Sequence, residues 1–268
     1  MGAMGRVVTL LTDFGTRDHY VASMKGVILS IAPGATVVDI THGVPKWDVR
    51  AGAYLLRCAY KYFPRGTVHV AVVDPGVGTG RRALAVETRD YYFVGPDNGL
   101  LMPAALEDGV VRVVSIENPR YTRPAVSHTF HGRDVFAPAA AHLALGVDIR
   151  ELGPEVTDYA VPGFARPRVG EAEVSGEVVY VDDFGNAATN VTLDDLGAAG
   201  LGYGDSVEVE TPRGTFAVRL VRTFGEVGEG EPLLLVNSEG FLELAVNRGR
   251  GSDYFGVSPG TPIRVRRR

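Results

Sequence analysis

The chain has few of the residues that form covalent cross-links or bind a negatively charged surface. Among 268 residues there is one cysteine, Cys58, so neither a disulfide framework nor a cluster of thiolate metal ligands can form. The 27 basic residues are outnumbered by 32 acidic ones, and the only dense basic run is the arginine-rich end at 264–268. This balance provides no electrostatic footprint for a nucleic acid or an anionic membrane.

Long apolar runs are also missing. None approaches the length of about 20 residues that spans a bilayer, and residues 1–5 lack the charge and apolar length of a signal peptide. We therefore expect a cytoplasmic protein with no membrane partner. With 45% hydrophobic residues and 34 glycines placed between apolar runs, the composition fits one large globular domain or two modest ones.

The first half of the chain alternates short β-rich runs with amphipathic segments, a pattern typical of an α/β layer architecture. It predicts a mixed, mostly parallel sheet between helices. The expected strands are residues 7–12, 36–40, 67–73, 83–88 and 91–94, and the expected helices are 18–31, 48–63 and 134–145.

The second half of the chain has a different pattern. Prolines and glycines at 153–154, 162–163 and 167 indicate an irregular connection, and we place the domain boundary there, with domains at 1–160 and 161–268. Short strands with turns between them follow and predict a smaller, all-β, barrel-like domain. These strands are expected at residues 173–181, 187–192, 206–210, 215–220, 233–237, 241–246 and 263–266.

Polar residues at strand ends are the first place to look for chemistry in an α/β layer. Asp13 follows the opening strand, where on its own it reads as a turn or capping residue. Asp74 also follows a strand and is succeeded by a glycine-rich loop that ends at Arg81. The loop lacks the Lys-Ser/Thr ending of a phosphate loop, but it could return Arg81 to Asp74 as a bidentate pair.

Two further segments carry candidate functional residues. In Phe-His-Gly-Arg-Asp, His131 precedes an expected helix and is followed by a glycine that permits close backbone approach, whereas His128 is treated as incidental. The purely structural interpretation of Asp-Asp-Phe-Gly-Asn, residues 182–186, is a hairpin turn. The alternative is that Phe184 stacks on a base while Asn186 reads its edge, as in nucleoside pockets.

Taken together, these motifs resemble those of a known family, the S-adenosyl-L-methionine hydroxide adenosyltransferases. The resemblance runs in order through nearly the whole chain and both expected domains. It is carried by residues 12–15, 38–42, 47–48, 73–78, 95–99, 130–134, 182–186 and 237–240.

The resemblance implies hydrolysis of S-adenosylmethionine to adenosine and methionine, with no metal or added cofactor. It also implies a homotrimer whose active sites lie between subunits. The hydrolytic members resemble this chain in having an Asp-Arg-His set, here Asp74, Arg81 and His131. Fluorinating and chlorinating relatives have a tyrosine in place of Asp74, and the fluorinating ones also have a serine in place of Gly132 and an extra loop that residues 89–92 lack.

Substrate-binding roles follow from the same resemblance. Asp13 matches the carboxylate that accepts the ribose hydroxyls, and Trp47 matches a wall of the nucleoside pocket. Phe184 and Asn186 match the residues that stack on adenine and read its edge, and backbone near Arg248 completes the adenine contacts. The positions that hold the methionine amino and carboxylate groups are matched by Asp182, Ser238 and Glu239, the last of which replaces an arginine of the halogenating relatives.

Several alternatives remain open from the sequence. Either Asp74 or His131 could be the base, and the nucleophile could be water or a halide ion. A metal-dependent hydrolase would use carboxylates and a histidine as ligands, and a non-catalytic sensor would bind the nucleoside without reacting. The metal ligands would be Asp13, Asp18, His19 and Asp74.

Overall fold

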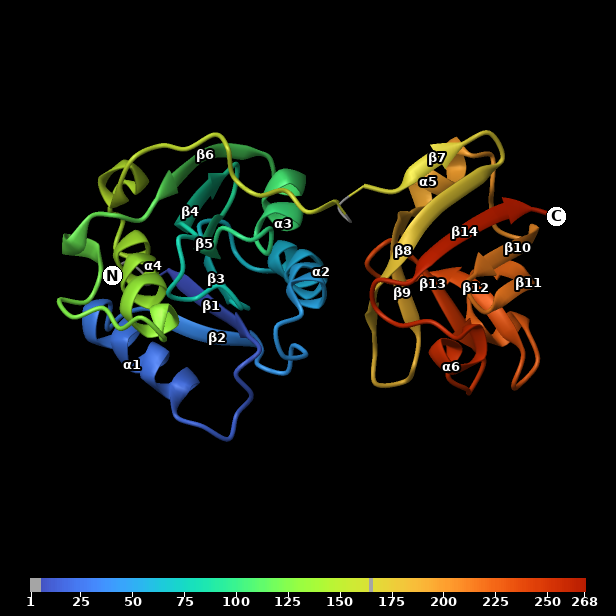
Figure 1. Cartoon of the computed structure of the whole chain (residues 1–268), viewed down its shortest axis with the longest axis horizontal. Coiled ribbons are helices and arrows are strands. Elements are labelled where there is room, and N and C mark those ends of the chain that lie inside the picture. Colours follow the sequence, from blue (N-terminus) through green and yellow to red (C-terminus); the bar gives the residue numbers. More distant parts are fainter. Residues whose placement is uncertain (1–5, 164–165) are drawn as a thin grey trace. The chain divides into compact units, whose positions relative to one another are not determined.

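A computed structural model describes residues 6–163 and 166–268 of the chain. The described residues form two compact units, one ending at Pro162 and the other beginning at Gly163 (Figure 1). No helix within the described ranges has both the length and the apolar character needed to cross a membrane.

The N-terminal unit is built on a mixed sheet, as predicted. Its strand order is β2-β1-β3-β5-β4-β6. The run β2-β1-β3-β5 is parallel, whereas β4 is antiparallel to both of its neighbours. The strands are β1 (Val7–Thr12), β2 (Thr36–Thr41), β3 (Val68–Val72), β4 (Ala83–Thr88), β5 (Tyr92–Pro96) and β6 (Val110–Ser115).

Helices cover both faces of this sheet, with α1 and α4 on one side and α2 and α3 on the other (Figure 1). The α-helices are α1 (Tyr20–Ile31), α2 (Val49–Ala59), α3 (Met102–Asp108) and α4 (Ala137–Ala144). Short 3₁₀ turns occur at Tyr60–Tyr62, Pro119–Tyr121 and Ile149–Leu152, and a π-helix at Gly132–Phe136 leads into α4.

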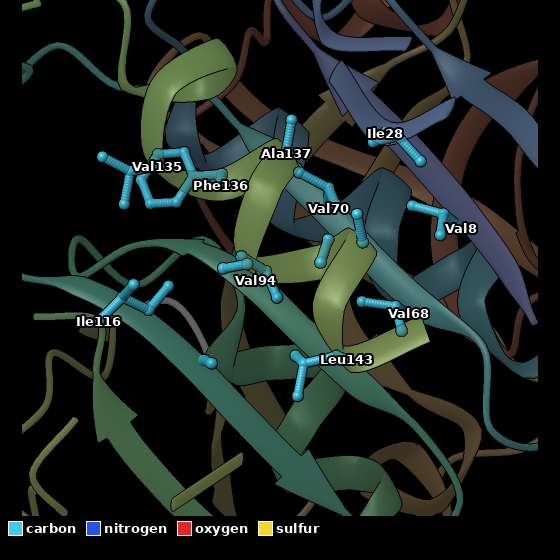
Figure 2. Close-up of a cluster of buried hydrophobic side chains, with 14 of the residues drawn as sticks. Val8, Ile28, Val68, Val70, Val94, Ile116, Val135, Phe136, Ala137 and Leu143 are labelled. Carbon is cyan, nitrogen blue, oxygen red and sulfur yellow. The ribbon is translucent and has the colours of Figure 1, made fainter. Parts of the chain in front are cut away.

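The core of the N-terminal unit lies between the sheet and the layer of α1 and α4. Strand residues Val8, Val70 and Val94 pack there against Ile28 of α1 and Leu143 of α4 (Figure 2). Since parallel strands in the middle of a sheet are covered on both faces, they consist almost entirely of apolar residues. Strand β3, which is buried throughout, shows this composition.

The C-terminal unit contains a closed barrel. Strands follow the order β14-β10-β11-β12-β13-β9-β8, and β14 also pairs with β8, which closes the ring; β7 pairs with the outer edge of β8. The interior is filled by apolar side chains such as Val178, Leu220, Leu242 and Phe255. The strands are β7 (Arg168–Gly170), β8 (Glu173–Val181), β9 (Ala187–Thr192), β10 (Ser206–Thr211), β11 (Gly214–Val221), β12 (Pro232–Val236), β13 (Phe241–Val246) and β14 (Pro262–Arg267).

The expectation of an all-β second domain needs correction. Helices α5 (Leu193–Ala198) and α6 (Gly251–Phe255) interrupt the strand pattern, and a 3₁₀ turn lies at Phe224–Glu226. Both helices are shorter than two turns, so their sequences carry little helical periodicity. Phe255 of α6 is fully buried and belongs to the barrel core, so this helix is part of the fold.

Candidate active site

The loop that follows β3 brings Arg81 back to Asp74. The Nε atom of Arg81 donates to both carboxylate oxygens of Asp74, at 3.0 and 3.1 Å. The two side chains are only 10% and 5% exposed. Within the loop, Gly78 has a φ of +76°, and a Cβ there would lie 2.3 Å from the backbone oxygen of His128, so no other residue fits this close approach.

Arg81 also contacts His131. Its Nη2 atom lies 2.8 Å from Nδ1 of the imidazole. Because a guanidinium only donates hydrogen bonds, Nδ1 must be the acceptor, and the proton of the neutral ring is then on Nε2. Burial and the positive charge of Arg81 lower the pKa of His131 below its ordinary value of 6.5. The centroid of the Phe136 ring lies 5.3 Å from the central carbon of the Arg81 guanidinium.

A buried carboxylate holds the segment that carries His131. Asp134 is fully buried and accepts hydrogen bonds from the Arg133 guanidinium and from the backbone N–H of Ser127. Although burial alone would raise it, these hydrogen bonds hold the pKa of Asp134 below its usual value. His131 thus stands at the start of a π-helix whose first turn is tied to the preceding loop, a local geometry that is frequent at functional sites.

A cavity of about 420 Å³ in the N-terminal unit brings four of the predicted residues together. Asp13, Trp47, Asp74 and His131 line it, whereas Arg81 contacts two of them without lining the cavity itself. The backbone N–H of Trp47 donates to Oδ2 of Asp13 at 2.8 Å. Trp47 has a φ of +62°, which is strained for a large side chain, and the residue is 70% exposed.

A second cavity, of about 860 Å³, lies in the C-terminal unit and collects most of the other predicted residues. Asp182 accepts hydrogen bonds from the backbone N–H of Asn186 at 2.8 Å and from its side-chain amide at 3.1 Å. Phe184, at the tip of this hairpin, is 79% exposed. The predicted residues that line the cavity are Asp182, Phe184, Asn186, Ser238 and Arg248; Glu239 does not line it.

Lys46 and Glu243 line these cavities and were not among the predicted site residues. Lys46 lines the N-terminal cavity, where its ammonium group donates to the backbone oxygen of Asp13. Glu243 lines the C-terminal cavity and is buried, and burial raises its pKa although Asn237 donates a hydrogen bond to it. A glutamate within the apolar strand β13 was the signal that could have revealed Glu243, because acidic residues are rarely buried in the interior of a strand.

The alternative of a metal-dependent hydrolase lacks its ligand set. Within residues 6–163 and 166–268, no three His, Cys, Asp or Glu side chains come together as a metal site requires. Asp13, Asp18 and Asp74 all line the N-terminal cavity, but they do not converge with His19 on one point.

Comparison with known proteins identifies the family. Residues 8–153 match the model of the SAM hydroxide adenosyltransferase N-terminal domain, and residues 176–264 match that of the C-terminal domain. The chain belongs to this family. A curated relative from Thermus thermophilus, named (R)-S-adenosyl-L-methionine hydrolase, is 46% identical over 97% of this chain and 99% of its own length.

Other relatives show how far the family extends. A protein from an Actinoplanes species, named fluorinase, is 31% identical over 97% of both chains. Among solved structures, an uncharacterized conserved protein from Thermotoga maritima has a TM-score of 0.90 and 42% identity, and the match covers 97% of this chain and all of that one. The resemblance deduced from the motifs is therefore confirmed.

Proposed function

We propose that the protein hydrolyses S-adenosyl-L-methionine to adenosine and L-methionine, by in-line attack of water on the 5′ carbon of the ribose. The observation that carries the proposal is the partly buried, hydrogen-bonded set Asp74, Arg81 and His131 beside a cavity that Asp13 and Trp47 also line. Curated relatives of 43–46% identity bear the name of this hydrolase.

The chemistry needs few groups. The sulfonium leaves as a neutral thioether, so the leaving group requires neither a proton nor a metal. The demand falls on the attacking water, which must be held in line and must lose a proton. Since the charges of hydroxide and sulfonium cancel on the way to the transition state, excluding bulk water also favours the reaction.

The contacts of Arg81 favour Asp74 as the base. The guanidinium occupies Nδ1 of His131, so the neutral imidazole presents the Nε2–H bond and acts as a hydrogen-bond donor. A carboxylate has lone pairs beyond those used by Arg81. In our proposal His131 therefore orients the water and Asp74 accepts its proton.

Substrate binding is assigned to both units. In the N-terminal cavity Asp13 accepts the ribose hydroxyls and Trp47 covers the nucleoside. In the C-terminal cavity Phe184 stacks on adenine, Asn186 reads its edge, and backbone near Arg248 completes the contacts. Asp182, Ser238 and Glu239 hold the amino and carboxylate groups of the methionyl portion.

We further propose a homotrimer with intersubunit active sites, in the cytoplasm, with no cofactor besides the substrate. The two groups of site residues lie in different units of the chain, so a complete site needs a cavity of each kind. Light scattering after gel filtration tests the assembly and should give three times the mass of the 28.6 kDa chain.

The activity is tested by incubating the protein with S-adenosylmethionine and separating the products by chromatography. Adenosine and methionine are expected, and Asp74→Asn should lower kcat about 10²–10⁴-fold, as loss of a general base does, with KM nearly unchanged. Asp90→Asn, at a partly buried turn of the same unit that does not line the cavity, is the control. Undiminished turnover by the Asp74 variant would remove Asp74 from the mechanism, and a 5′-halogenated nucleoside as the main product in chloride or fluoride would overturn the hydrolase.

A further inference from the structure

Residues 39–42 lie within one of the motifs that carry the family resemblance, but the proposed reaction gives them no role. This segment ends strand β2, beside the end of β1, and the two strands run parallel. Their register shifts at this point, because Leu10 pairs with Asp39 whereas Leu11 pairs with Thr41. Such irregularities commonly re-aim side chains near functional sites.

The side chain that follows this irregularity, His42, connects β2 to β1. Its Nδ1 atom lies 2.9 Å from Oγ1 of Thr12, the last residue of β1. Its Nε2 atom lies 3.1 Å from Oδ1 of Asp39. Thr12 is fully buried and His42 is 6% exposed, so both act away from solvent.

The positions of the hydrogen atoms on Thr12 and His42 follow from the donors and acceptors around them. Oγ1 of Thr12 accepts the backbone N–H of Phe14 at 3.1 Å, which leaves its own O–H directed to Nδ1 of His42. Asp39 beside Nε2 favours the tautomer with its proton there. The ring thus accepts from Thr12 through Nδ1, and its Nε2 atom faces the Asp39 carboxylate. The backbone oxygen of His42 accepts the N–H of Gly15 at 2.8 Å.

These contacts hold the residues on both sides of Asp13. Thr12 precedes it, and Phe14, whose N–H is bonded to Thr12, follows it. Asp13 itself is 6% exposed and lines the N-terminal cavity. The direction of its carboxylate therefore depends on this turn, which the hydroxyl of Thr12 and the imidazole of His42 support, and on the backbone N–H of Trp47, which donates to its Oδ2 atom at 2.8 Å.

We propose that His42 and Thr12 form a positioning relay that fixes the Asp13 turn for binding a vicinal diol. The relay touches neither the reacting carbon nor the water, so its members are positioning residues. The inference rests on the proposed function, in which Asp13 accepts the hydroxyls of the ribose.

The same strand contains a matched control. Thr9 is also fully buried in β1, and its Oγ1 atom lies 2.8 Å from Nδ1 of His69. That pair is surrounded by Tyr60, Tyr91 and Phe93 and does not line the cavity. Thr9→Val and Thr12→Val thus remove the same group from the same kind of pair, but only Thr12 adjoins Asp13.

The test measures binding of adenosine and of 2′,3′-dideoxyadenosine by calorimetry. Thr12→Val should weaken adenosine binding about tenfold, the contribution of one hydrogen bond, and should leave dideoxyadenosine binding within about twofold. Thr12→Ser, which keeps the hydroxyl, should restore adenosine binding, and Thr9→Val should leave it unchanged. Equal weakening of both nucleosides, or no weakening of either, would overturn the relay.

A second pair of variants covers the case in which Thr12→Val fails to fold. His42→Asn retains an acceptor at the Nδ1 position, whereas His42→Leu does not, so only the leucine variant should raise KM for S-adenosylmethionine about tenfold with kcat within twofold. Equal KM values for these two variants would refute the relay. Failure of the proposed function is seen separately, because the wild-type protein would then form no adenosine.

Discussion

Removing one partner of the Asp74–Arg81 ion pair should lower the free energy of unfolding strongly, and removing both should cost less than the sum of the two single losses. Arg81→Gln leaves Asp74 buried without its counter-charge, and Asp74→Asn leaves the guanidinium in the same position. Removing one partner of a buried, hydrogen-bonded ion pair typically costs about 3–5 kcal/mol. These side chains are 10% and 5% exposed, but Asp74 also lines the cavity, so we expect a loss at the lower end of that range.

The two single variants should differ from each other. Arg81 contacts His131 and the face of Phe136 as well as Asp74, whereas the contacts of Asp74 described above are with Arg81. We therefore expect Arg81→Gln to lower the free energy of unfolding more than Asp74→Asn does. The double variant buries neither charge and should be about 0.5–3 kcal/mol more stable than the sum of the two single effects predicts.

Urea unfolding at pH 7, followed by circular dichroism, measures these free energies. The wild-type, the two single variants and the double variant complete the cycle. Additive effects, or a loss of less than about 1 kcal/mol in Arg81→Gln, would show that the pair is solvated and that the burial argument is wrong.

Three further predictions concern the same residues. A Cβ at Gly132 would lie 3.2 Å from both Met24 and Phe130, so Gly132→Ser should lower kcat/KM without producing halogenated nucleoside in a chloride or fluoride assay. Because the pKa of His131 is lowered and its neutral form is the active one, kcat/KM should be kept as pH falls to 6.5 and be lost only below it; a loss above pH 6.5 would contradict this. Phe184→Ala, at a side chain 79% exposed, should raise KM with kcat unchanged and shift stability by no more than about 0.5 kcal/mol.

Much of the fold could be read from local patterns. Strands 7–12, 83–88, 173–181, 187–192 and 241–246 have the predicted bounds, because alternating or continuous apolar runs between turn residues determine them. Helix α3 has seven residues, too few to show helical periodicity, and was missed. Strand β6 was missed although its Val-Val-Arg-Val-Val run has a strand composition.

The site was predicted unevenly, for physical reasons. The return of Arg81 to Asp74 follows from a glycine-rich loop of the right length, and the structure shows the pair. The positioning role that we propose for Thr12 leaves no signal in the sequence, because threonine is an ordinary strand residue and Thr12 is the last residue of a strand. The π-helix after His131 was read as an ordinary helix, since one extra residue per turn depends on packing around Asp134 and Phe136 and leaves no signal in sequence.

The placement of Trp47 has a practical consequence. It is the only tryptophan in the chain, and it lines the N-terminal cavity and is largely exposed. Its intrinsic fluorescence, excited near 295 nm, therefore comes from a single known position. Titration with a nucleoside that covers the indole should shift the emission to shorter wavelength, which provides a label-free optical signal for occupancy.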